Sequence, residues 1–394
     1  MNLKKRSTIQ ITIFVFTILI SLTYSLYLKD LINFKLLSFG DLNPYGGWSE
    51  LKSAFTDVGY RFSGISKSTA LTSSILLTSL FFGRFFCGFI CPIGALQDFF
   101  TFIGNRLNIK KITVKNKIHK KLILLKYFVF ISALVLSIFG LGRLISPYSP
   151  WLAFLNISMG LSFTLGTYIL ITILVLSLVV PRIFCRYLCP LGAFQSLWYA
   201  AGFFKVKNSS NCKSCNYCLK ECPVEIKSPH ESREVSPECI SCLKCVDTTC
   251  IRDDYTYSIN IFNRELNKNK YIAFSLIIFI SIYSFLPLID TSAGSQDISN
   301  FGSLKDGTYI GTGIGFGGPL RIELTVDNGN IENIEVVNHR ESTGYYEEVF
   351  KMKRREIIEN QSLSIDTVSG ATATSRGFFS AVKSAVSQSL EYNE

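Results

Sequence analysis

Apolar residues are distributed along the chain in two different ways. Before residue 290 they form long stretches, and after it they alternate with polar residues. The stretches are long enough, or nearly so, for a helix that crosses a hydrocarbon layer, which needs about 20 residues. They cover roughly 8–28, 71–90, 122–139, 161–180 and 271–289. This pattern predicts a multi-pass α-helical membrane protein with five crossings.

The pattern after the last stretch predicts a small α+β domain. Apolar and polar residues alternate between Leu320 and Val326, as in a strand with one buried face. The turn residues at 327–330 precede a second apolar run, so the two runs predict a hairpin. Helical stretches follow at about 346–359 and 375–390.

Composition and charge agree with a membrane protein. Apolar residues make up 48% of the chain and charged residues only 18%, whereas soluble domains carry about a quarter. The net charge of +11 is unevenly divided, because residues 290–394 hold 9 basic and 15 acidic residues and the remainder holds 31 and 14. This asymmetry is typical of a membrane protein with basic cytoplasmic loops and argues against a nucleic-acid partner.

Basic residues in the loops predict the orientation of the chain in the lipid bilayer. Loop 97–121 holds seven basic residues and one acid, and loop 146–160 holds no charge. Three basic residues precede the first stretch, which no small-residue cleavage site follows, so we interpret it as an uncleaved anchor. Placing both basic segments in the cytoplasm puts 201–270 there as well. Five crossings then leave 290–394 outside.

Two of the apolar stretches end in a repeated motif. Residues 84–97 match residues 182–195 at a constant offset of 98, and eight of the fourteen positions are identical. The identical positions include an arginine, Arg84 and Arg182, and both cysteines of a Cys-x-x-x-Cys-Pro sequence. These cysteines are Cys87, Cys91, Cys185 and Cys189.

The spacing of each cysteine pair predicts two thiols on one face of a helix, since residues i and i+4 are neighbours there. The proline disfavours helix at the second cysteine, so each segment should end at that point. If the repeats pack about a pseudo-twofold axis, four thiols converge near the membrane surface. They could hold an iron–sulfur cluster or another soft metal, and the two arginines could offset its negative charge. Small buried residues or disulfides are the alternative, and the spacing leaves both open.

Eight further cysteines form two runs between the fourth and fifth stretches. The runs are Cys212-x2-Cys215-x2-Cys218-x3-Cys222-Pro223 and Cys239-x2-Cys242-x2-Cys245-x4-Cys250. They resemble bacterial two-cluster ferredoxins, in which the fourth cysteine of each run binds the other cluster. The resemblance assigns one [4Fe–4S] cluster to Cys212, Cys215, Cys218 and Cys250, and a second to Cys239, Cys242, Cys245 and Cys222. The second run is one residue longer and lacks the proline. A zinc ribbon, the alternative, would use paired hooks.

The C-terminal domain carries the sequence Asp366-Thr367-Val368-Ser369-Gly370-Ala371-Thr372. Ahead of a helix it is an ordinary turn and cap that could hold a phosphate. It also resembles the signature of FMN-binding domains in the Rnf and sodium-pumping quinone reductase complexes. That resemblance implies that a flavin transferase links FMN to Thr372, with Asp366, Ser369, Gly370 and Ala371 as the recognition frame. Residues His339 to Gly344 lie where such domains have a flavin-contacting loop.

The repeated Cys-x-x-x-Cys-Pro helices followed by a two-cluster segment resemble membrane iron–sulfur proteins of the NapH and NosR kind. The likeness covers 71–250, although NosR-type proteins place the flavin domain first. We expect a transmembrane region with four helices, a cytoplasmic ferredoxin-like domain, a linker with the fifth helix, and an extracytoplasmic FMN-binding domain. Their ranges are 1–200, 201–256, 257–290 and 291–394.

The resemblance implies an electron-transfer component rather than a self-contained enzyme, and we see no catalytic triad, acid–base pair or nucleotide loop. A cytoplasmic donor of the ferredoxin or flavoprotein class would reduce the clusters. The covalent external FMN would then reduce an extracytoplasmic acceptor. Two alternatives use the same parts: a redox-sensing regulator or maturation factor for a partner metalloenzyme, and an iron–sulfur scaffold without flavin.

Overall fold

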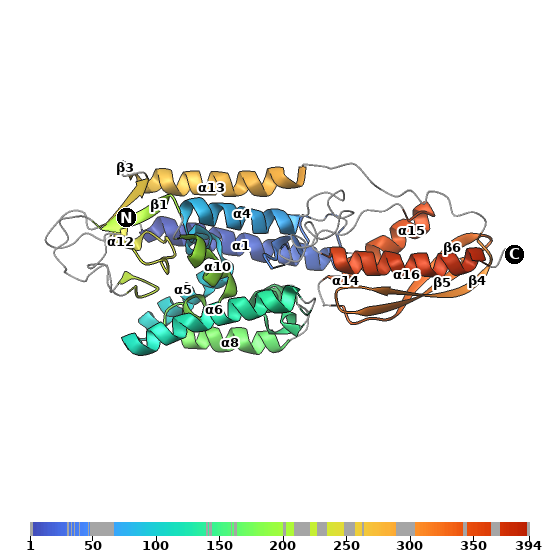
Figure 1. Ribbon diagram of the computed structural model, residues 1–394, viewed down its shortest axis with the longest axis horizontal. Helices are drawn as coiled ribbons and strands as arrows, with labels where there is room; N and C mark the ends of the chain where they lie inside the picture. The colour runs from blue at the N-terminus through green and yellow to red at the C-terminus, as the bar shows by residue number, and fades with distance from the viewer. Residues whose placement is uncertain are drawn as a thin grey trace. The chain divides into compact units, whose positions relative to one another are not determined.

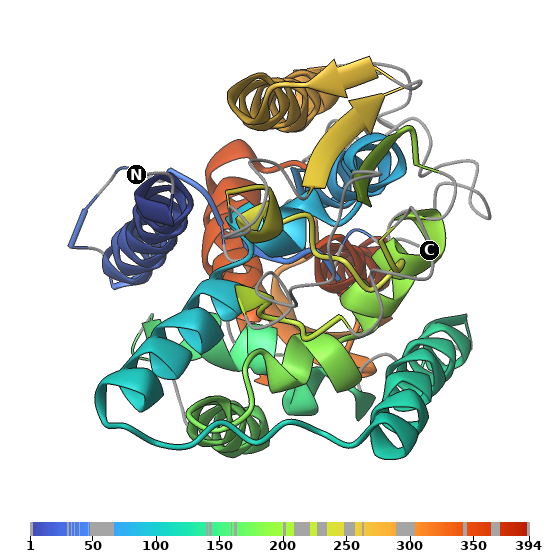
Figure 2. The ribbon, with the colours of Figure 1, turned by 90° about the vertical axis from the view of Figure 1, so that its left-hand side faces the viewer.

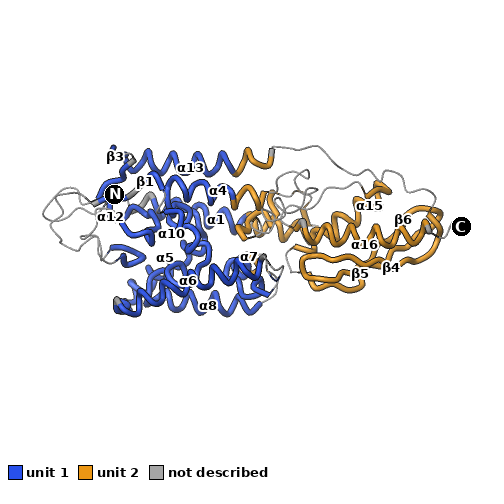
Figure 3. Tube along the Cα trace, viewed as in Figure 1, with its two compact units in different colours: residues 1–19, 73–154, 163–282 blue, residues 20–72, 155–162, 283–394 orange. Residues whose placement is uncertain are grey.

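The computed structural model describes most of the chain in separate segments. These are residues 3–29, most of 31–47, 67–138, 144–158, 164–199, 202–208, 221–226, 235–247, 257–261, 264–288, 304–341, 345–363 and 371–391. The chain forms two compact units, shown in different colours in Figure 3. The first contains residues 1–19, 73–154 and 163–282, and the second contains residues 20–72, 155–162 and 283–394.

A helix occupies each of the five predicted apolar stretches (Figure 1). These helices are α1 (Leu3–Leu28), α4 (Lys67–Phe82), α6 (Asn116–Ile138), α8 (Leu165–Ser177) and α13 (Lys268–Phe285). They run roughly parallel to one another and are seen nearly end-on in Figure 2. Within the described residues, Arg6–Leu28 is the one helix that is both long and apolar enough to cross a membrane, and α8 is a shorter apolar helix.

Short helices connect the long ones at the repeated motif. In the first repeat they are the π-helix η2 (Phe86–Ile90) and α5 (Pro92–Arg106), and in the second they are α9 (Ile183–Tyr187) and α10 (Pro190–Tyr199). The sequence pattern predicts a loop over 97–121, but residues 97–106 are helical because α5 continues to Arg106. The remaining short helices are η1 (Gly40–Leu42), η4 (Ser146–Tyr148), α7 (Pro150–Ser158), α12 (Lys244–Asp247) and η5 (Leu286–Leu288).

A small antiparallel sheet in the first unit flanks the ferredoxin-like segment. Its strands are β1 (Phe204–Asn208), β2 (Tyr257–Ile261) and β3 (Arg264–Leu266), in that order. Tyr257 and Ile259 of β2 share a buried core with Phe82 and Phe85, which stand at the start of the first repeat. The sheet therefore fixes the cysteine segment to the repeat.

The second unit contains the predicted α+β domain, with three antiparallel strands in the order β4-β5-β6 and helices against them. The elements are β4 (Gly307–Ile314), β5 (Pro319–Asp327), β6 (Asn330–Asn338), α14 (Tyr346–Glu348), the π-helix η6 (Val349–Lys353), α15 (Arg354–Asn360) and α16 (Thr372–Glu391). The predicted hairpin is confirmed, and its turn places Asn328 at φ +50° and Gly329 at φ +74°. Positive φ at both central residues is the geometry that joins twisted strands.

Glycines bring α16 very close to β4. A Cβ at Gly311 would lie 1.9 Å from the carbonyl oxygen of Ala381, and one at Gly313 would lie 2.0 Å from that of Gly377. No other residue type fits at this distance, because the obstructing atoms belong to the helix backbone. The glycine-rich stretch therefore fixes the position of α16, the helix that starts at Thr372.

Candidate functional site

Each cysteine pair lies where its helical segment ends, as the proline predicts. Cys91 has an extended backbone (φ −61°, ψ 117°), and Pro92 begins α5. In the first repeat the expected α-helical turn is replaced by the π-helix η2, and the amide of Cys91 donates to the carbonyl oxygen of Phe86, five residues earlier. In the second repeat the turn is the α-helix α9, and the amide of Cys189, just past its end, donates to the carbonyl oxygen of Phe184.

The two repeats meet through a reciprocal exchange of arginines. Arg182 Nη1 donates to the carbonyl oxygen of Cys87 at 2.8 Å, and Arg84 Nη2 lies 3.5 Å from that of Cys185. Both guanidinium groups are almost completely buried. Each repeat thus presents its arginine to the first cysteine of the other, which is the arrangement expected for two repeats related by a pseudo-twofold axis.

The last residue of the repeat makes the same crossed contact. Gln97 Nε2 lies 3.2 Å from Cys185 Sγ, and Gln195 Oε1 lies 3.2 Å from Cys87 Sγ. Gln195 Nε2 is buried and has no hydrogen-bond partner. Rotating this amide by half a turn would direct its N–H at Cys87 and complete the symmetry, because oxygen and nitrogen exchange places.

The donor set around these cysteines suits an anionic sulfur-ligated group. The four thiols are free and lie in buried or half-buried positions. Among the described residues, buried N–H donors without a partner include Arg84 Nε, Arg186 Nε and Nη1, and Gln195 Nε2. Buried donors are nearly always satisfied, so this concentration of unpaired N–H groups favours an anion as their partner.

The four cysteines assigned to the second ferredoxin cluster come together. Cys222, Cys239, Cys242 and Cys245 line a single pocket with apolar walls. In the described part of the chain no three His, Cys, Asp or Glu side chains are grouped to share one metal ion. A cubane instead takes one thiolate at each of its four irons, so its ligands surround a volume, as these four do. The cysteines assigned to the first cluster, Cys212, Cys215, Cys218 and Cys250, lie outside the described residues.

The second-cluster segment is in contact with the first cysteine of the first repeat. Cys87, Val224, Ile240 and Cys242 form one buried cluster. A Cβ at Gly88 would lie 2.4 Å from the carbonyl oxygen of Ile240 and 3.4 Å from the Cα of Cys242. A cysteine from each proposed centre therefore belongs to one packed group of side chains.

Asp98 neutralises the arginine of the second repeat. Arg182 donates to both oxygens of Asp98 at 2.8 Å, and Arg6 Nη2 donates at 2.6 Å. Burial alone would raise the pKa of the Asp98 carboxyl, but the charges of Arg182 and Arg6 outweigh it and hold the pKa well below its usual range.

Glu238 plays the equivalent part for the arginine of the first repeat. Arg84 Nη1 donates to its side chain at 3.2 Å and to its main-chain oxygen at 3.1 Å. Lys126 and Tyr127 of α6 also donate to this carboxylate. Burial would raise the pKa of Glu238, but the two cations lower it overall. Neither acid was predicted from the sequence to be a site residue, and no role was predicted for the two glutamines, although the glutamines are identical positions of the repeat.

The structure distinguishes the hydroxyls near the proposed flavin attachment point. Thr374 is buried, and its hydroxyl donates to Glu341 Oε2 at 2.5 Å, while the Ser375 hydroxyl donates to the carbonyl oxygen of Ala371 at 3.0 Å. Thr372 begins α16. Asp366, Ser369 and Gly370 lie outside the described residues. Both neighbouring hydroxyls are thus already engaged in the fold.

Glu341 joins three parts of the C-terminal domain. Besides Thr374 of α16, it accepts a hydrogen bond from the amide of Gly317 at 2.9 Å. It belongs to the stretch that begins at His339, whose ring packs against Tyr346 and Phe350. The predicted flavin-contacting stretch is therefore tied to the start of α16, and its last three residues, 342–344, lie outside the described residues.

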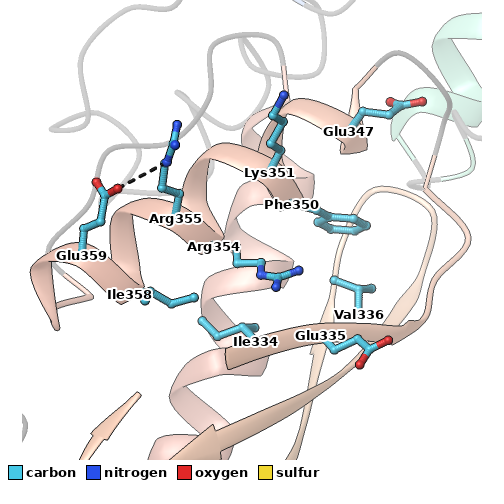
Figure 4. Close-up of a pocket in the computed structure, with 10 residues that line it drawn as sticks. All are labelled: Ile334, Glu335, Val336, Glu347, Phe350, Lys351, Arg354, Arg355, Ile358 and Glu359. Carbon is cyan, nitrogen blue, oxygen red and sulfur yellow. Dashed lines mark ion pairs between the residues drawn. The ribbon is translucent and has the colours of Figure 1, made fainter. Parts of the chain in front are cut away.

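An open groove lies beside this stretch, between β6 and the helices η6 and α15 (Figure 4). Its volume is about 660 Å³, and Val336 and Phe350 form part of its apolar lining. Its cations are largely engaged at the surface, since Arg354 donates to Asn333 and Arg355 pairs with Glu359. We assign no ligand to the groove.

Comparisons with known proteins agree with both halves of this arrangement. A 4Fe-4S binding domain family matches residues 70–110 and 150–208, and an FMN-binding domain family matches residues 315–387. The first match contains both Cys-x-x-x-Cys-Pro motifs, and the second contains Glu341 and Thr372. No solved structure matches the chain.

The iron–sulfur half has several relatives. An uncharacterised protein of Methanocaldococcus jannaschii is 38% identical over 47% of this chain and 76% of its own length. The regulatory protein NosR of Pseudomonas aeruginosa is 29% identical over 42% of this chain and 24% of its own length. The ferredoxin-type protein NapH of Escherichia coli is 26% identical over 48% of this chain and 68% of its own length. The chain belongs to the NapH/NosR-type family of membrane 4Fe–4S proteins and carries an FMN-binding domain at its C-terminal end.

Proposed function

We propose that the protein transfers electrons across the membrane, from a cytoplasmic reductant through iron–sulfur centres to covalent FMN and an extracytoplasmic acceptor. Iron–sulfur clusters carry single electrons, and FMN accepts electrons singly and delivers two. The residues of this chain hold these groups, exclude water and fix their separation. Donors of the ferredoxin or flavoprotein class have suitable reducing power.

The observation that carries the proposal is that Cys87 and Cys242 belong to one buried cluster of side chains. Because electron tunnelling falls steeply with distance, neighbouring centres must lie close together. One buried cluster of side chains contains a cysteine of the second ferredoxin site and a cysteine of the membrane repeat. This contact supports an electron step between the two sites.

Exposed apolar side chains support a multi-pass arrangement. Phe128 on α6 is 69% exposed and Ile277 on α13 is 61% exposed, and each helix carries further exposed apolar residues. Contiguous apolar surface of this kind is costly in water and is satisfied by lipid. The basic excess of 97–121 supports placing the ferredoxin segment in the cytoplasm and the FMN domain outside.

Covalent attachment at Thr372 is supported by its neighbours. The hydroxyls of Thr374 and Ser375 are buried and hydrogen-bonded within the domain. Attachment of a bulky phosphate ester to either would break those bonds and open the core. Thr372, at the start of α16, is where the family signature places the link, and a helix N-terminus favours phosphate.

A regulatory role is the second candidate, and the name of the NosR relatives favours it. That name belongs to proteins of which this chain spans about a quarter. A regulator built from the same centres would show slow turnover and stable association with its partner enzyme. An electron conduit would show repeated turnover with a soluble acceptor.

The test uses full-length protein made with its flavin transferase and placed in sealed vesicles, with the ferredoxin segment facing outward. Dithionite or reduced ferredoxin added outside should reduce the enclosed flavin. Replacing Cys91 and Cys189 together by Ser should slow that reduction by orders of magnitude while both ferredoxin clusters and the FMN remain. Flavin that is not reduced in the wild-type protein would overturn the proposed function. An unchanged rate in the double variant, with no loss of iron, would return these cysteines to a structural role.

A further inference from the structure

The two repeats differ in polarity at one position within them and at the position that directly follows them. At the constant offset of 98 residues, Gly88 corresponds to Arg186, and Asp98 corresponds to Ser196. The reciprocal contacts of the arginines, cysteines and glutamines follow the symmetry of the repeat. The two differences between the repeats break that symmetry, and each one involves a contact with a charged partner or with the ferredoxin segment.

The first difference, Gly88 against Arg186, gives the second-cluster segment a close backbone contact from one repeat and an ion pair from the other. Gly88 has no side chain, and this allows the backbone of Ile240 and Cys242 to approach it directly. The corresponding Arg186 is buried, and its Nη2 donates to Glu225 Oε2 at 3.0 Å. Glu225 stands three residues after Cys222, another ligand assigned to the same cluster.

The second difference, Asp98 against Ser196, means that the arginine of the first repeat has to pair with an acid of the ferredoxin segment. In the first repeat Asp98 balances Arg182, but the second repeat has the neutral Ser196 at that position. Arg84 is paired instead with Glu238, which immediately precedes Cys239. Arg84 also donates to the main-chain oxygen of Glu238 at 3.1 Å, so the pair fixes the backbone next to the cysteine.

We propose that Glu238 and Glu225 are positioning residues that clamp the second cluster against the membrane cysteines. Their partners, Arg84 and Arg186, belong to the repeats that carry those cysteines, so the two ion pairs fix the backbone beside Cys239 and near Cys222. The inference deepens the proposed function, because it assigns the residues that set the distance of one electron step. In that step one electron leaves the second cluster and enters the membrane centre, and no bond forms or breaks.

The chain offers a matched control for Glu238. Glu221 also immediately precedes a cysteine of the second cluster, Cys222, but it is exposed. Glu221→Gln and Glu238→Gln therefore remove the same charge at the same sequence distance from a cluster ligand. A general electrostatic effect on the cluster would appear in both variants, whereas loss of the clamp would appear in Glu238→Gln alone.

The experiment measures iron content, flavin reduction in the sealed vesicles, and dipolar broadening of the second cluster's EPR signal by the membrane centre. Glu238→Gln should keep its iron but lose the broadening, and its flavin reduction should slow severalfold, because electron tunnelling falls exponentially with the separation of the centres. Glu221→Gln should match the wild-type protein in all three measurements. If Glu238→Gln loses iron, Glu225→Gln is compared instead, and exchanging the charges of Arg186 and Glu225 should restore the broadening.

Wild-type broadening and rate in an iron-loaded Glu238→Gln protein would overturn the clamp, as would equal slowing in Glu221→Gln. These outcomes are separate from failure of the proposed function. A wild-type protein that does not reduce its flavin across the vesicle would refute the conduit, and the broadening would still report whether Glu238 holds the two centres together.

Discussion

Replacing Thr372 and Thr374 by alanine should separate flavin attachment from folding, although the residues are only two positions apart. The Thr374 side chain is 2% exposed, and its hydroxyl donates to the Glu341 carboxylate at 2.5 Å. Glu341 also holds the amide of Gly317, so it joins the glycine-rich strand end to α16. Thr374→Ala removes one donor from a buried carboxylate, and Thr372→Ala removes the proposed attachment oxygen.

The expected sizes of the two effects are different. A hydrogen bond to a charged group contributes about 1.5–3 kcal/mol, so Thr374→Ala should lower the stability of the C-terminal domain by about 2 kcal/mol. In a domain of roughly 100 residues this corresponds to a fall in Tm of about 10 °C. Thr372→Ala should change the stability little, because Thr372 is the first residue of α16 and the cap position precedes it.

The assay combines in-gel flavin fluorescence after denaturation, peptide mass mapping and thermal unfolding of the full-length protein made with its flavin transferase. Thr372→Ala should lose the fluorescence and keep its Tm. Thr374→Ala should keep the fluorescence and lose stability, and Ser375→Ala serves as a second control that keeps its flavin. An FMN-modified peptide on Thr374 or Ser375 would refute the assignment, as would a stable Thr374→Ala protein without fluorescence.

Three further predictions address the first unit and the topology. The ferredoxin segment should hold about eight irons, and Cys242→Ala and Cys215→Ala should each remove one ferredoxin cluster signal, whereas zinc without iron would contradict the assignment. Asp98→Asn should destabilise the protein by about 3–5 kcal/mol at pH 7, because it leaves a buried guanidinium without its counter-ion. Because the pKa of Asp98 is lowered in the folded state, its contribution to the free energy of unfolding is complete above about pH 4 and is lost as the pH falls through the lowered pKa. The difference in stability between Asp98→Asn and the wild-type protein should therefore narrow in acid. A difference that does not change with pH would contradict this prediction. Reporters at Ser209 and Glu394 should label opposite faces of the membrane, and labelling on one face would reject the conduit.

The sequence predicted the elements because their signals are local. Long apolar runs gave the helices, alternation gave β5, and the Asn328–Gly329 turn gave the hairpin. The proline of each motif placed the helix ends at Cys91 and Cys189. The π-helix before Cys91 was missed, because a five-residue hydrogen bond has no distinct periodicity in so short a segment.

The contacts that complete the site join residues far apart in the sequence, and local sequence patterns do not predict such pairs. Glu238 is 154 residues from Arg84, and its neighbours in sequence resemble any polar turn. The role of the two glutamines could have been predicted from the sequence, because an identical polar residue at the end of an apolar repeat is unusual. The identical glycines of the repeat have a related explanation. A Cβ at Gly192 would lie 2.8 Å from Arg84 Nη2, so the glycine makes room for the crossing arginine.

The ion pairs around the cysteines contain more positive than negative charge. In the described part of the first unit, five cations pair with three carboxylates. The cations are Arg6, Arg84, Lys126, Arg182 and Arg186, and the acids are Asp98, Glu225 and Glu238. All five cations are almost fully buried, where an unbalanced charge is expensive. Thiolates and inorganic sulfides would supply the missing negative charge at both groups of cysteines. The buried arginines, the unpaired N–H groups and the free thiols are therefore explained together if the repeats and the ferredoxin segment enclose anionic iron–sulfur centres.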